Sequence, residues 1–367
     1  MHIFCTGATG MMGSEVVPKL LAAGHEVYAL IRTKRDSWHH NLHFVPGDIT
    51  KPIVYKGHAT FDAVLHMAAL TSLRESNEGF LTRVNYLGTQ NIVEFCLSHH
   101  VRELFHISTL YVCGDHRGVW REEHYNEGQG FKNRYESSKY AAESLVRHHP
   151  LLRTTILRSG ILVGRYQDGS SAFFEGFYRP VRAIVYAHRF AEQKLGLPPR
   201  EELEHAMHLP RLSIPVRIWG QAESTLALTP VDWAADQVIK VVGKELGRES
   251  KTTPVYHVAP DRLPTMANIT RGTNAGLGIG GWNAGPHTRN PLDLFYNRLI
   301  RDYLPYTKDQ PDFETSLGHT CPVVDEEFIA RCVRYWRTHG SREQAGVPVP
   351  GRGDYQRLEQ TGGQGAI

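Results

Sequence analysis

The chain has 367 residues, of which 41% are hydrophobic and 22% are charged, so it is long enough and apolar enough to bury a core. These proportions exclude a disordered or fibrous protein. The formal net charge is only +3 and the basic residues are scattered, so we expect no nucleic-acid partner. No apolar run reaches the ~18 residues that a membrane span needs.

The cysteine and histidine content favours a reduced, cytoplasmic protein without a metal site. The five cysteines form no pair at zinc-ligand spacing, and an odd number suits a disulfide framework badly. The 21 histidines include three doublets near predicted helix ends and loops, where solvated caps are commoner than metal ligands. The first residues run directly into a strand pattern, so we also expect no signal peptide.

Short apolar runs alternate with amphipathic stretches through the first half of the chain. The predicted strands are His2–Thr6, His25–Ile31, Leu42–Pro46, Ala63–Met67, Leu104–Ser108 and Thr154–Arg158. The predicted helices are Met12–Ala23, Val84–Leu97 and Tyr135–Arg147. This alternation predicts the α/β class, with a doubly wound parallel sheet of the Rossmann type.

The alternation fades in the second half. Two late strands, Val216–Trp219 and Val255–Val258, lie on either side of a predicted helix at Val231–Val242. The glycines of Gly272–Gly285 follow no predicted strand, so we expect a flexible loop there. The region from Pro291 to His339 has a helical pattern.

A glycine-rich turn, TGATGMMG at residues 6–13, follows the first strand and opens the first helix. Gly7 permits the tight turn, Gly10 lets the backbone approach phosphates, and Gly13 allows close packing of the helix on the sheet. The free amides and the helix dipole then hold the anion. The predicted dinucleotide cradle consists of Gly7, Thr9, Gly10, Met11, Met12 and Gly13.

The end of the second strand bears on the choice of dinucleotide. An acidic residue there accepts hydrogen bonds from the ribose of NAD, but this strand continues into Arg32 and Arg35, with no carboxylate before Asp36. A guanidinium suits a 2′-phosphate, so NADPH is favoured over NAD, with Arg32 ahead of Arg35; the alternative is a solvated basic loop. Four further residues are assigned to the adenine edge and the fourth strand's end: Asp48, Ile49, Ala68 and Ala69.

Tyr135 and Lys139 begin the third predicted helix. Their spacing of four residues places both side chains on one helix face. A nearby ammonium favours the phenolate, so we expect a lowered tyrosine pKa and a usable proton donor to a carbonyl oxygen that receives hydride.

A hydroxyl residue is also expected at this site, because ligands of open parallel sheets bind beyond the carboxyl ends of the strands. The fifth strand ends at such an edge with Ser108 and Thr109. Thr109 is the favoured candidate to hydrogen-bond the substrate oxygen and stabilise its developing charge, and Ser108 competes with it. The alternative for either residue is to cap the strand end.

Together these motifs resemble the extended short-chain dehydrogenase/reductases, whose pattern is a TGxxGxxG turn, a hydroxyl residue and YxxxK. The resemblance covers residues 1–258 and implies cofactor contacts by Gly7, Gly10 and Gly13. It implies catalytic roles for Thr109, Tyr135 and Lys139, with Lys139 also holding the nicotinamide ribose. Segments that match the family further are His66–Ala69, Asn85, Leu157–Gly164, in which Ser159 replaces the usual proline, and Leu228–Asp232.

Within that superfamily the chain is most similar to thioester reductases and fatty acyl reductases. The features are the Phe131–Asn133 segment before Tyr135, the arginine after the second strand, and Arg158–Gly164 followed by Asp168–Ser170. Those relatives reduce acyl groups carried on phosphopantetheine or coenzyme A. No carrier or adenylation module is recognisable in this sequence, so a thioester substrate would arrive in trans.

These inferences predict an NADPH-dependent reductase of a carbonyl or acyl-thioester substrate, giving an aldehyde or an alcohol. A homodimer is the candidate assembly. Two alternatives remain. One is a nucleotide-sugar epimerase or dehydratase, or a hydroxysteroid-type dehydrogenase, using NAD; the other is a non-catalytic dinucleotide sensor. The expected domains are a cofactor domain at 1–165 to which 213–260 return, a substrate-binding part at 166–212 and 261–340, and a disordered tail at 341–367.

Overall fold

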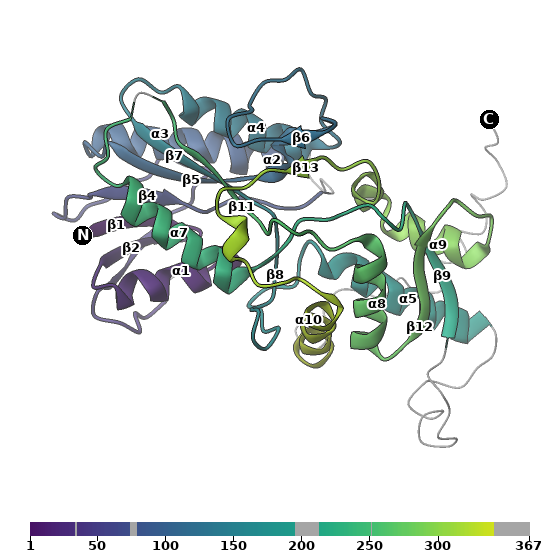
Figure 1. The fold of residues 1–367 in the computed structure, drawn as a ribbon. Coiled ribbons are helices and arrows are strands. Elements are labelled where there is room, and N and C mark those ends of the chain that lie inside the picture. Colours follow the sequence, from purple (N-terminus) through teal and green to yellow (C-terminus); the bar gives the residue numbers. More distant parts are fainter. Residues whose placement is uncertain (34, 74–78, 195–212, 251, 341–367) are drawn as a thin grey trace.

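Seven parallel strands form the main sheet in the residues that the structure, a computed structural model, describes: 1–33, 35–73, 79–194, 213–250 and 252–340 (Figure 1). Its strands are β1 (His2–Thr6), β2 (Glu26–Ile31), β3 (Leu42–Pro46), β4 (Ala63–His66), β5 (Glu103–Thr109), β7 (Arg153–Ser159) and β11 (Val255–Val258). Their order is β11-β7-β5-β4-β1-β2-β3. The doubly wound α/β fold is therefore confirmed.

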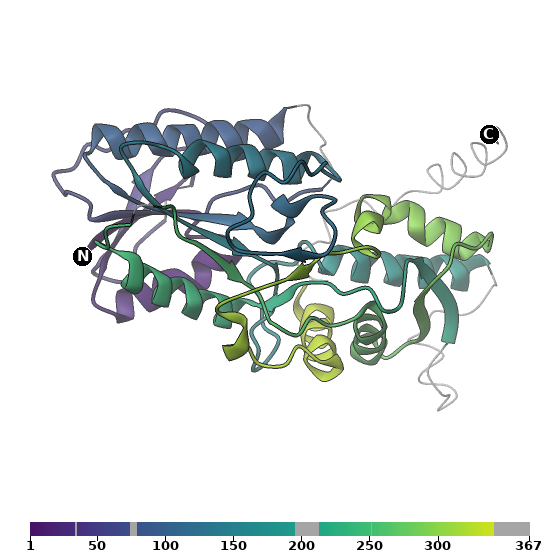
Figure 2. The same cartoon turned by 45° about the horizontal axis from the view of Figure 1, so that its top comes forward.

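Helices cover both faces of this sheet, which is why most residues of its central strands are buried. One face packs on α1 (Met11–Ala22) and α7 (Val231–Glu245), and the other on α3 (Gly88–Ser98) and α4 (Arg134–Arg147), as Figures 1 and 2 show. Before α3 come one short turn, α2 (Phe80–Thr82), and a π-helical turn, η1 (Arg83–Leu87). The strand order reverses between β1 and β4, and ligands of such sheets bind at the carboxyl ends there.

A second hydrophobic core lies beside the sheet (Figure 2). Its helices are α5 (Tyr178–Lys194), α8 (Met266–Leu277), α9 (Pro291–Leu299) and α10 (Glu326–His339). It also contains β9 (Ser213–Trp219), which pairs with β12 (Gly280–Gly285) in a separate parallel pair. Of the segment 213–260, α7 and β11 pack on the main sheet, whereas β9 belongs to the second core.

Short elements connect the two cores. They are η2 (Leu110–Cys113), η3 (Arg301–Tyr306) and η4 (Gly318–Thr320), all 3₁₀-helical, and the strands β6 (Val119–Trp120), β8 (Ile161–Val163), β10 (Leu228–Pro230) and β13 (Asp312–Phe313). Strand β8 pairs with β10, and β6 with β13. The helical pattern expected from Pro291 to His339 is thus confirmed only for α9 and α10, with 3₁₀ turns and β13 between them.

The prediction of a flexible loop at Gly272–Gly285 is wrong. Its first half completes α8 and its second half is β12. A Cβ on Gly272 or Gly276 would lie 2.7 or 2.6 Å from atoms of α10. These glycines therefore allow α8 and α10 to pack closely. Composition alone does not distinguish such glycines from those of a flexible loop.

Parts of the expected domains lie outside the described residues, namely the tail at 341–367 and residues 195–212 of the substrate-binding part. Within the described ranges, no helix is long and apolar enough to cross a membrane. The same ranges contain no group of three or more histidine, cysteine or acidic side chains arranged to hold a metal ion.

Candidate active site

The first turn of α4 carries Tyr135, and Lys139 follows one turn later. Asn133 begins the helix: its side-chain oxygen accepts the Glu136 amide at 3.0 Å, which satisfies one of the amides that a helix start leaves free. Tyr135 is half-buried and Lys139 is buried. This cap therefore fixes where α4 begins and, with it, the position of Tyr135 in the first turn.

Thr109 ends β5, and its hydroxyl hydrogen-bonds the Tyr135 phenol. The same oxygen accepts the backbone amide of Tyr111 at 3.3 Å. The competing candidate, Ser108, is 2% exposed, and its hydroxyl has no hydrogen-bond partner among the described residues. The structure thus brings Thr109, and not Ser108, to the tyrosine.

The Lys139 amine donates a 2.7 Å hydrogen bond to the Ile107 carbonyl of β5. Burial lowers its pKa to about 8, although the Glu143 carboxylate acts in the opposite direction. The expectation of a lowered tyrosine pKa is wrong: burial raises the pKa of Tyr135 to about 12, against the hydrogen bond from Thr109, and Glu136 raises it further. Desolvation of the phenolate is the largest cause of this shift, and the expected neighbour, Lys139, directs its amine to the Ile107 carbonyl.

A buried chain of hydrogen bonds connects β1 to the helices beside this site. His66 connects Thr6 of β1, at 2.7 Å, to Thr89 of α3, at 3.0 Å. Thr89 donates to the Asn85 carbonyl and Thr6 accepts the Ala68 amide, so the bond directions place the imidazole proton on Nε2. Burial brings the pKa of His66 down to about 3, which keeps the ring neutral.

Asn85 extends this chain of hydrogen bonds to the turn that carries Tyr135. Its amide group donates to the Ser138 hydroxyl at 2.9 Å and exchanges two bonds with the backbone of Leu70. Ser138 in turn donates to the Tyr135 carbonyl at 2.8 Å. Asn85 lies in the π-helical turn, a distortion frequent at functional sites. The resemblance identified Asn85, but no sequence pattern revealed its partners.

The glycine turn contacts the end of β4. Gly7 has φ +70°, and a Cβ there would lie 2.6 Å from the Ala68 nitrogen, so this position excludes any side chain. A Cβ on Gly13 would lie 2.2 Å from the Gly7 carbonyl oxygen, so Gly13 allows contact with the turn itself more than with the sheet. Around Gly10 a Cβ would meet only that oxygen, at 3.2 Å.

The start of α1 is suited to an anion. Its first intrahelical bond runs from Ser14 to the Gly10 carbonyl, so the amides of Met11, Met12 and Gly13 precede it. Within the described residues, no side chain caps this end and its first turn contains no acid. Thr9 is exposed and Met11 is half-buried, whereas the Met12 side chain packs in the core and offers only its amide.

The residues assigned to the adenosine side lie along the next strand ends. Arg32 and Arg35 are exposed, just beyond β2. Asp48 accepts the Thr50 amide and hydroxyl at 2.9 and 2.8 Å; these bonds, with the charge of Arg32 nearby, lower the pKa of its carboxyl. Ile49 is buried, and Ala68 and Ala69 are half-buried after β4.

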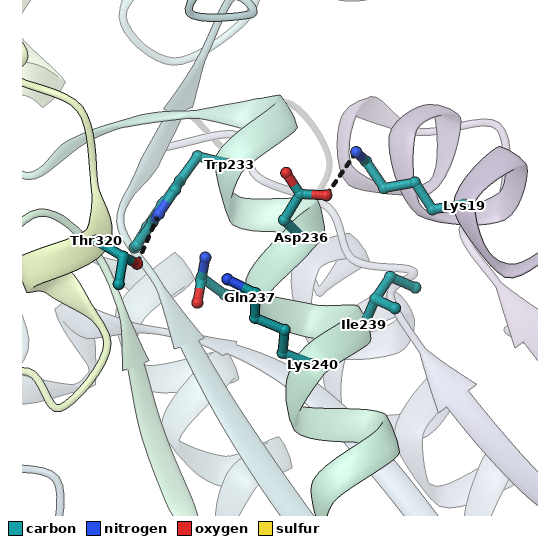
Figure 3. A pocket seen from close by; sticks show the side chains of 7 residues that line it. All are labelled: Lys19, Trp233, Asp236, Gln237, Ile239, Lys240 and Thr320. Atoms are coloured by element: carbon teal, nitrogen blue, oxygen red, sulfur yellow. Dashed lines mark hydrogen bonds and ion pairs between the residues drawn. The ribbon is translucent and has the colours of Figure 1, made fainter. Parts of the chain in front are cut away.

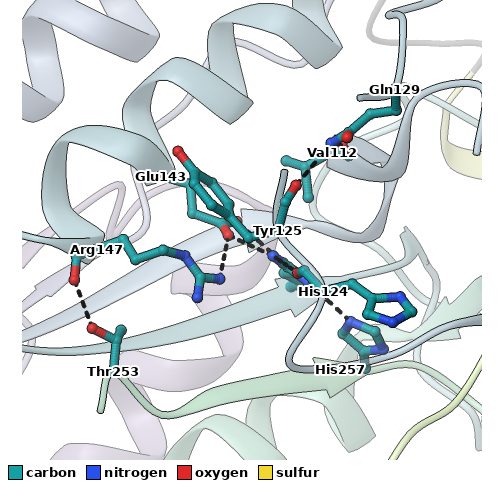
Figure 4. Close-up of polar contacts among 9 residues, drawn as sticks. Val112, His124, Tyr125, Gln129, Glu143, Arg147, Thr253 and His257 are labelled. Carbon is teal, nitrogen blue, oxygen red and sulfur yellow. Dashed lines mark hydrogen bonds and ion pairs between the residues drawn. The ribbon is translucent and has the colours of Figure 1, made fainter. Parts of the chain in front are cut away.

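An unpredicted charge cluster lies further along α4 (Figure 4). The fully buried Glu143 accepts two hydrogen bonds from Arg158 of β7, at 2.6 and 3.2 Å, and one from Arg147, at 2.8 Å. Arg158 also donates to the His124 carbonyl at 2.8 Å. Burial raises the pKa of Glu143, but the two guanidiniums outweigh it and bring it to about 2. The cluster ties the helix of Lys139 to the sheet.

A surface pocket lies elsewhere and is formed by residues of α1, α7 and η4 (Figure 3). It is lined by Lys19, Trp233, Asp236, Gln237, Ile239, Lys240 and Thr320. An ion pair of 2.6 Å joins Lys19 of α1 to Asp236 of α7, and the Trp233 ring nitrogen donates a hydrogen bond to the Thr320 hydroxyl. It contains none of the predicted site residues.

Several known proteins are similar to this chain in sequence or in fold. Residues 3–185 match the NAD dependent epimerase/dehydratase family. A Stigmatella aurantiaca protein named 4-hydroxy-2-methyl-3-oxo-4-farnesyl-3,4-dihydroquinoline-1-oxide ketoreductase is 30% identical over 177 residues, 45% of this chain and 51% of that protein. UDP-glucose 4-epimerase of Caenorhabditis elegans is 26% identical over 198 residues, 46% and 56% of the two chains. The chain thus spans about half the length of these curated relatives.

Solved structures share the fold over most of the chain. The terminal R domain from the myxalamid PKS-NRPS biosynthetic pathway has a TM-score of 0.67 at 21% identity, covering 95% of this chain and 92% of that one. MoeE5 in complex with UDP-glucuronic acid and NAD has a TM-score of 0.60 at 20% identity, covering 92% and 99%. Through residues 3–185, about half its length, the chain belongs to the NAD dependent epimerase/dehydratase family of extended short-chain dehydrogenase/reductases.

Proposed function

We propose that this protein is an NADPH-dependent reductase of a carbonyl or acyl-thioester substrate. The observation that carries the proposal is the hydrogen bond between Thr109 and Tyr135, next to Lys139 and at the edge of the sheet where α1 begins. A phenol and a hydroxyl that meet in this way suit one carbonyl oxygen, which accepts from both as charge develops on it. The relative named as a ketoreductase and the solved structure of a thiolation-reductase di-domain support this proposal.

The residues of the glycine turn fit a dinucleotide. The α1 amides would hold the pyrophosphate. The turn keeps its shape because Gly7 and Gly13 have no side chain that would collide with the backbone around it. Lys139 would hold the nicotinamide ribose. Asp48, Ile49, Ala68 and Ala69 would line the adenosine side. When bound, the reduced nicotinamide supplies a hydride.

The chain's own residues would supply the proton. Tyr135 would give its phenolic proton to the substrate oxygen, and solvent would return a proton to the phenolate. Thr109 donates to the same oxygen and Lys139 stabilises the phenolate. A thioester would form a hemithioacetal that collapses to an aldehyde and a free thiol, and a second reduction would give the alcohol.

The pH dependence of reduction should follow Lys139. Its pKa is lowered to about 8, so the ammonium that stabilises the phenolate is lost as the pH rises through that value. Tyr135, with a pKa of about 12, keeps its proton over the same range. We expect kcat/KM, which reports on the free enzyme, to be level through neutral pH and to fall above pH 8. In Lys139→Arg the fall should move to higher pH; a wild-type profile level to about pH 10 would contradict the assignment.

Replacing Arg32 tests the choice of NADPH. Loss of a charged hydrogen bond to a phosphate costs about 1.5–3 kcal/mol, so Arg32→Gln should weaken NADPH binding about 10- to 100-fold. Binding of NADH, measured by the same fluorescence titration, should not change. Arg35→Gln identifies which of the two arginines contacts the phosphate. Equal weakening of NADH and NADPH would show that Arg32 does not recognise the 2′-phosphate.

The substrate class is tested by following NADPH oxidation with acyl-CoA, acyl-carrier, aldehyde and ketone substrates. We expect turnover of at least one class, and a thioester acyl group would be presented on a carrier or on coenzyme A. The second candidate function is a nucleotide-sugar epimerase or dehydratase using NAD, favoured by the relatives named UDP-glucose 4-epimerase and dTDP-glucose 4,6-dehydratase. Such an enzyme regenerates its cofactor in every turnover. Conversion of a nucleotide sugar without net cofactor oxidation, and failure on every carbonyl class, would favour it.

A further inference from the structure

Tyr306 reaches the active-site helix from the far end of the sequence. It ends η3, is 6% exposed, and its hydroxyl donates to the Glu136 carboxylate at 2.6 Å while accepting the Asn133 side-chain amide at 2.7 Å. Asn133 caps α4 and Glu136 directly follows Tyr135. One phenol therefore holds both sides of the helical turn that presents the predicted proton donor.

The ring of Tyr306 contacts the second half of the site. It packs edge-on against Tyr111, with ring centroids 5.0 Å apart and planes at 88°. The Tyr111 amide is hydrogen-bonded to the Thr109 hydroxyl. The Lys132 ammonium lies 5.3 Å from the Tyr306 ring centre and donates to Gln310 at 3.1 Å, which adds a further contact between the two segments.

The segment that carries Tyr306 is itself fixed to the second core. The hydroxyl of the next residue, Thr307, donates to the Trp219 carbonyl at 2.6 Å. The backbone carbonyl of Thr307 accepts the Gln221 amide at 3.0 Å. Trp219 ends β9, which belongs to the second core. Tyr306 thus joins that core to the active-site helix.

We propose that Tyr306 is a positioning residue for this reaction: its hydroxyl holds the first turn of α4 and its ring holds the segment after β5, so that the Thr109 hydroxyl and the Tyr135 phenol meet at one substrate oxygen. The proposal rests on the proposed function, because it assigns Tyr306 to the same reactive pair. Small displacements of reacting groups reduce rates strongly, even when binding is retained.

Tyr306→Phe tests this with little loss of packing, because it keeps the ring and removes only the hydroxyl. We expect kcat to fall about 10-fold, the NADPH dissociation constant to stay unchanged, and the solvent deuterium isotope effect on kcat to rise because proton transfer from Tyr135 becomes slower. A purely structural role would lower the fraction of active enzyme and leave the isotope effect unchanged. That result, or an unchanged kcat, would overturn the proposal.

A matched control comes from the same 3₁₀ turn. Tyr303 lies three residues earlier, among the charges of Arg179, Glu175, Asp302 and Arg182, and Tyr303→Phe should leave kcat and the isotope effect unchanged. If Tyr306→Phe does not fold, Glu136→Gln weakens the same contact from the helix side and must raise the isotope effect. Tyr135→Phe separates the two hypotheses: if it keeps full activity, the proposed function fails, whereas a normal Tyr306→Phe beside an inactive Tyr135→Phe overturns only the positioning role.

Discussion

Replacing Tyr135 with phenylalanine should reduce turnover about 10²- to 10⁴-fold, the range attributed to a positioned general acid. The phenol is the group at the sheet edge that meets the Thr109 hydroxyl, and burial keeps it protonated, with a pKa of about 12. Phenylalanine keeps the ring but has no proton to give. The rate of NADPH oxidation with an active carbonyl substrate measures the loss, and NADPH binding measured by fluorescence should be retained.

Tyr140 provides the control on the same helix. It is half-buried, and its ring stacks on the Tyr125 ring with the ring centroids 4.9 Å apart. Tyr140→Phe should therefore reduce turnover by less than tenfold, a change of under about 1.4 kcal/mol. A Tyr135→Phe variant as active as Tyr140→Phe would exclude Tyr135 as the proton donor and favour a dinucleotide-binding protein without catalysis.

Replacing Glu143 with glutamine should lower the free energy of unfolding by about 3–5 kcal/mol, because it leaves a buried guanidinium without its counterion. Arg158 is fully buried, and its other hydrogen-bond partners, the His124 carbonyl at 2.8 Å and the His257 ring at 3.4 Å, carry no negative charge. Urea unfolding followed by circular dichroism measures the loss. An effect below about 1 kcal/mol, the value of a surface pair, would contradict the role of this cluster.

Glu175→Gln is the matched control for this variant. Glu175 also pairs with an arginine four residues along its chain, Arg179, at 2.5 Å, but both side chains are 40% or more exposed. Such a pair contributes about 0–1 kcal/mol, so its removal should be close to neutral.

The same ion pair predicts an acid-dependent loss of stability. The pKa of Glu143 is lowered from 4.5 to about 2 in the folded chain, so its contribution is present above pH 4.5 and is lost as the pH falls towards 2. Glu143→Gln should reduce this part of the acid dependence, whereas Glu175→Gln should retain it. Unfolding curves at several pH values between these limits measure the difference.

Local pattern was sufficient for the first half of the fold. The strands β1, β2, β4, β5 and β7 are buried along almost their whole length. A strand that is covered on both faces has a sequence pattern that can be recognised from its own residues. The turn at residues 6–13 and the Tyr135–Lys139 pair were readable for the same reason, because each lies within a few consecutive residues. The roles of these residues in catalysis and binding remain predictions.

Contacts between distant segments decided the rest. The glycines of α8 have a loop-like composition, and only the packing of α10 against them explains why they lie in a helix. Glu143 acquires its buried partner Arg158 from β7, and Tyr306 meets Glu136 of α4 from 170 residues away in the sequence. The pKa of Tyr135 was predicted in the wrong direction because spacing shows a neighbouring charge but not desolvation. Composition, periodicity and local motifs thus determine the sheet and its glycine turn, whereas burial and long-range pairing depend on the folded chain, since both are properties of surroundings that the linear order does not contain.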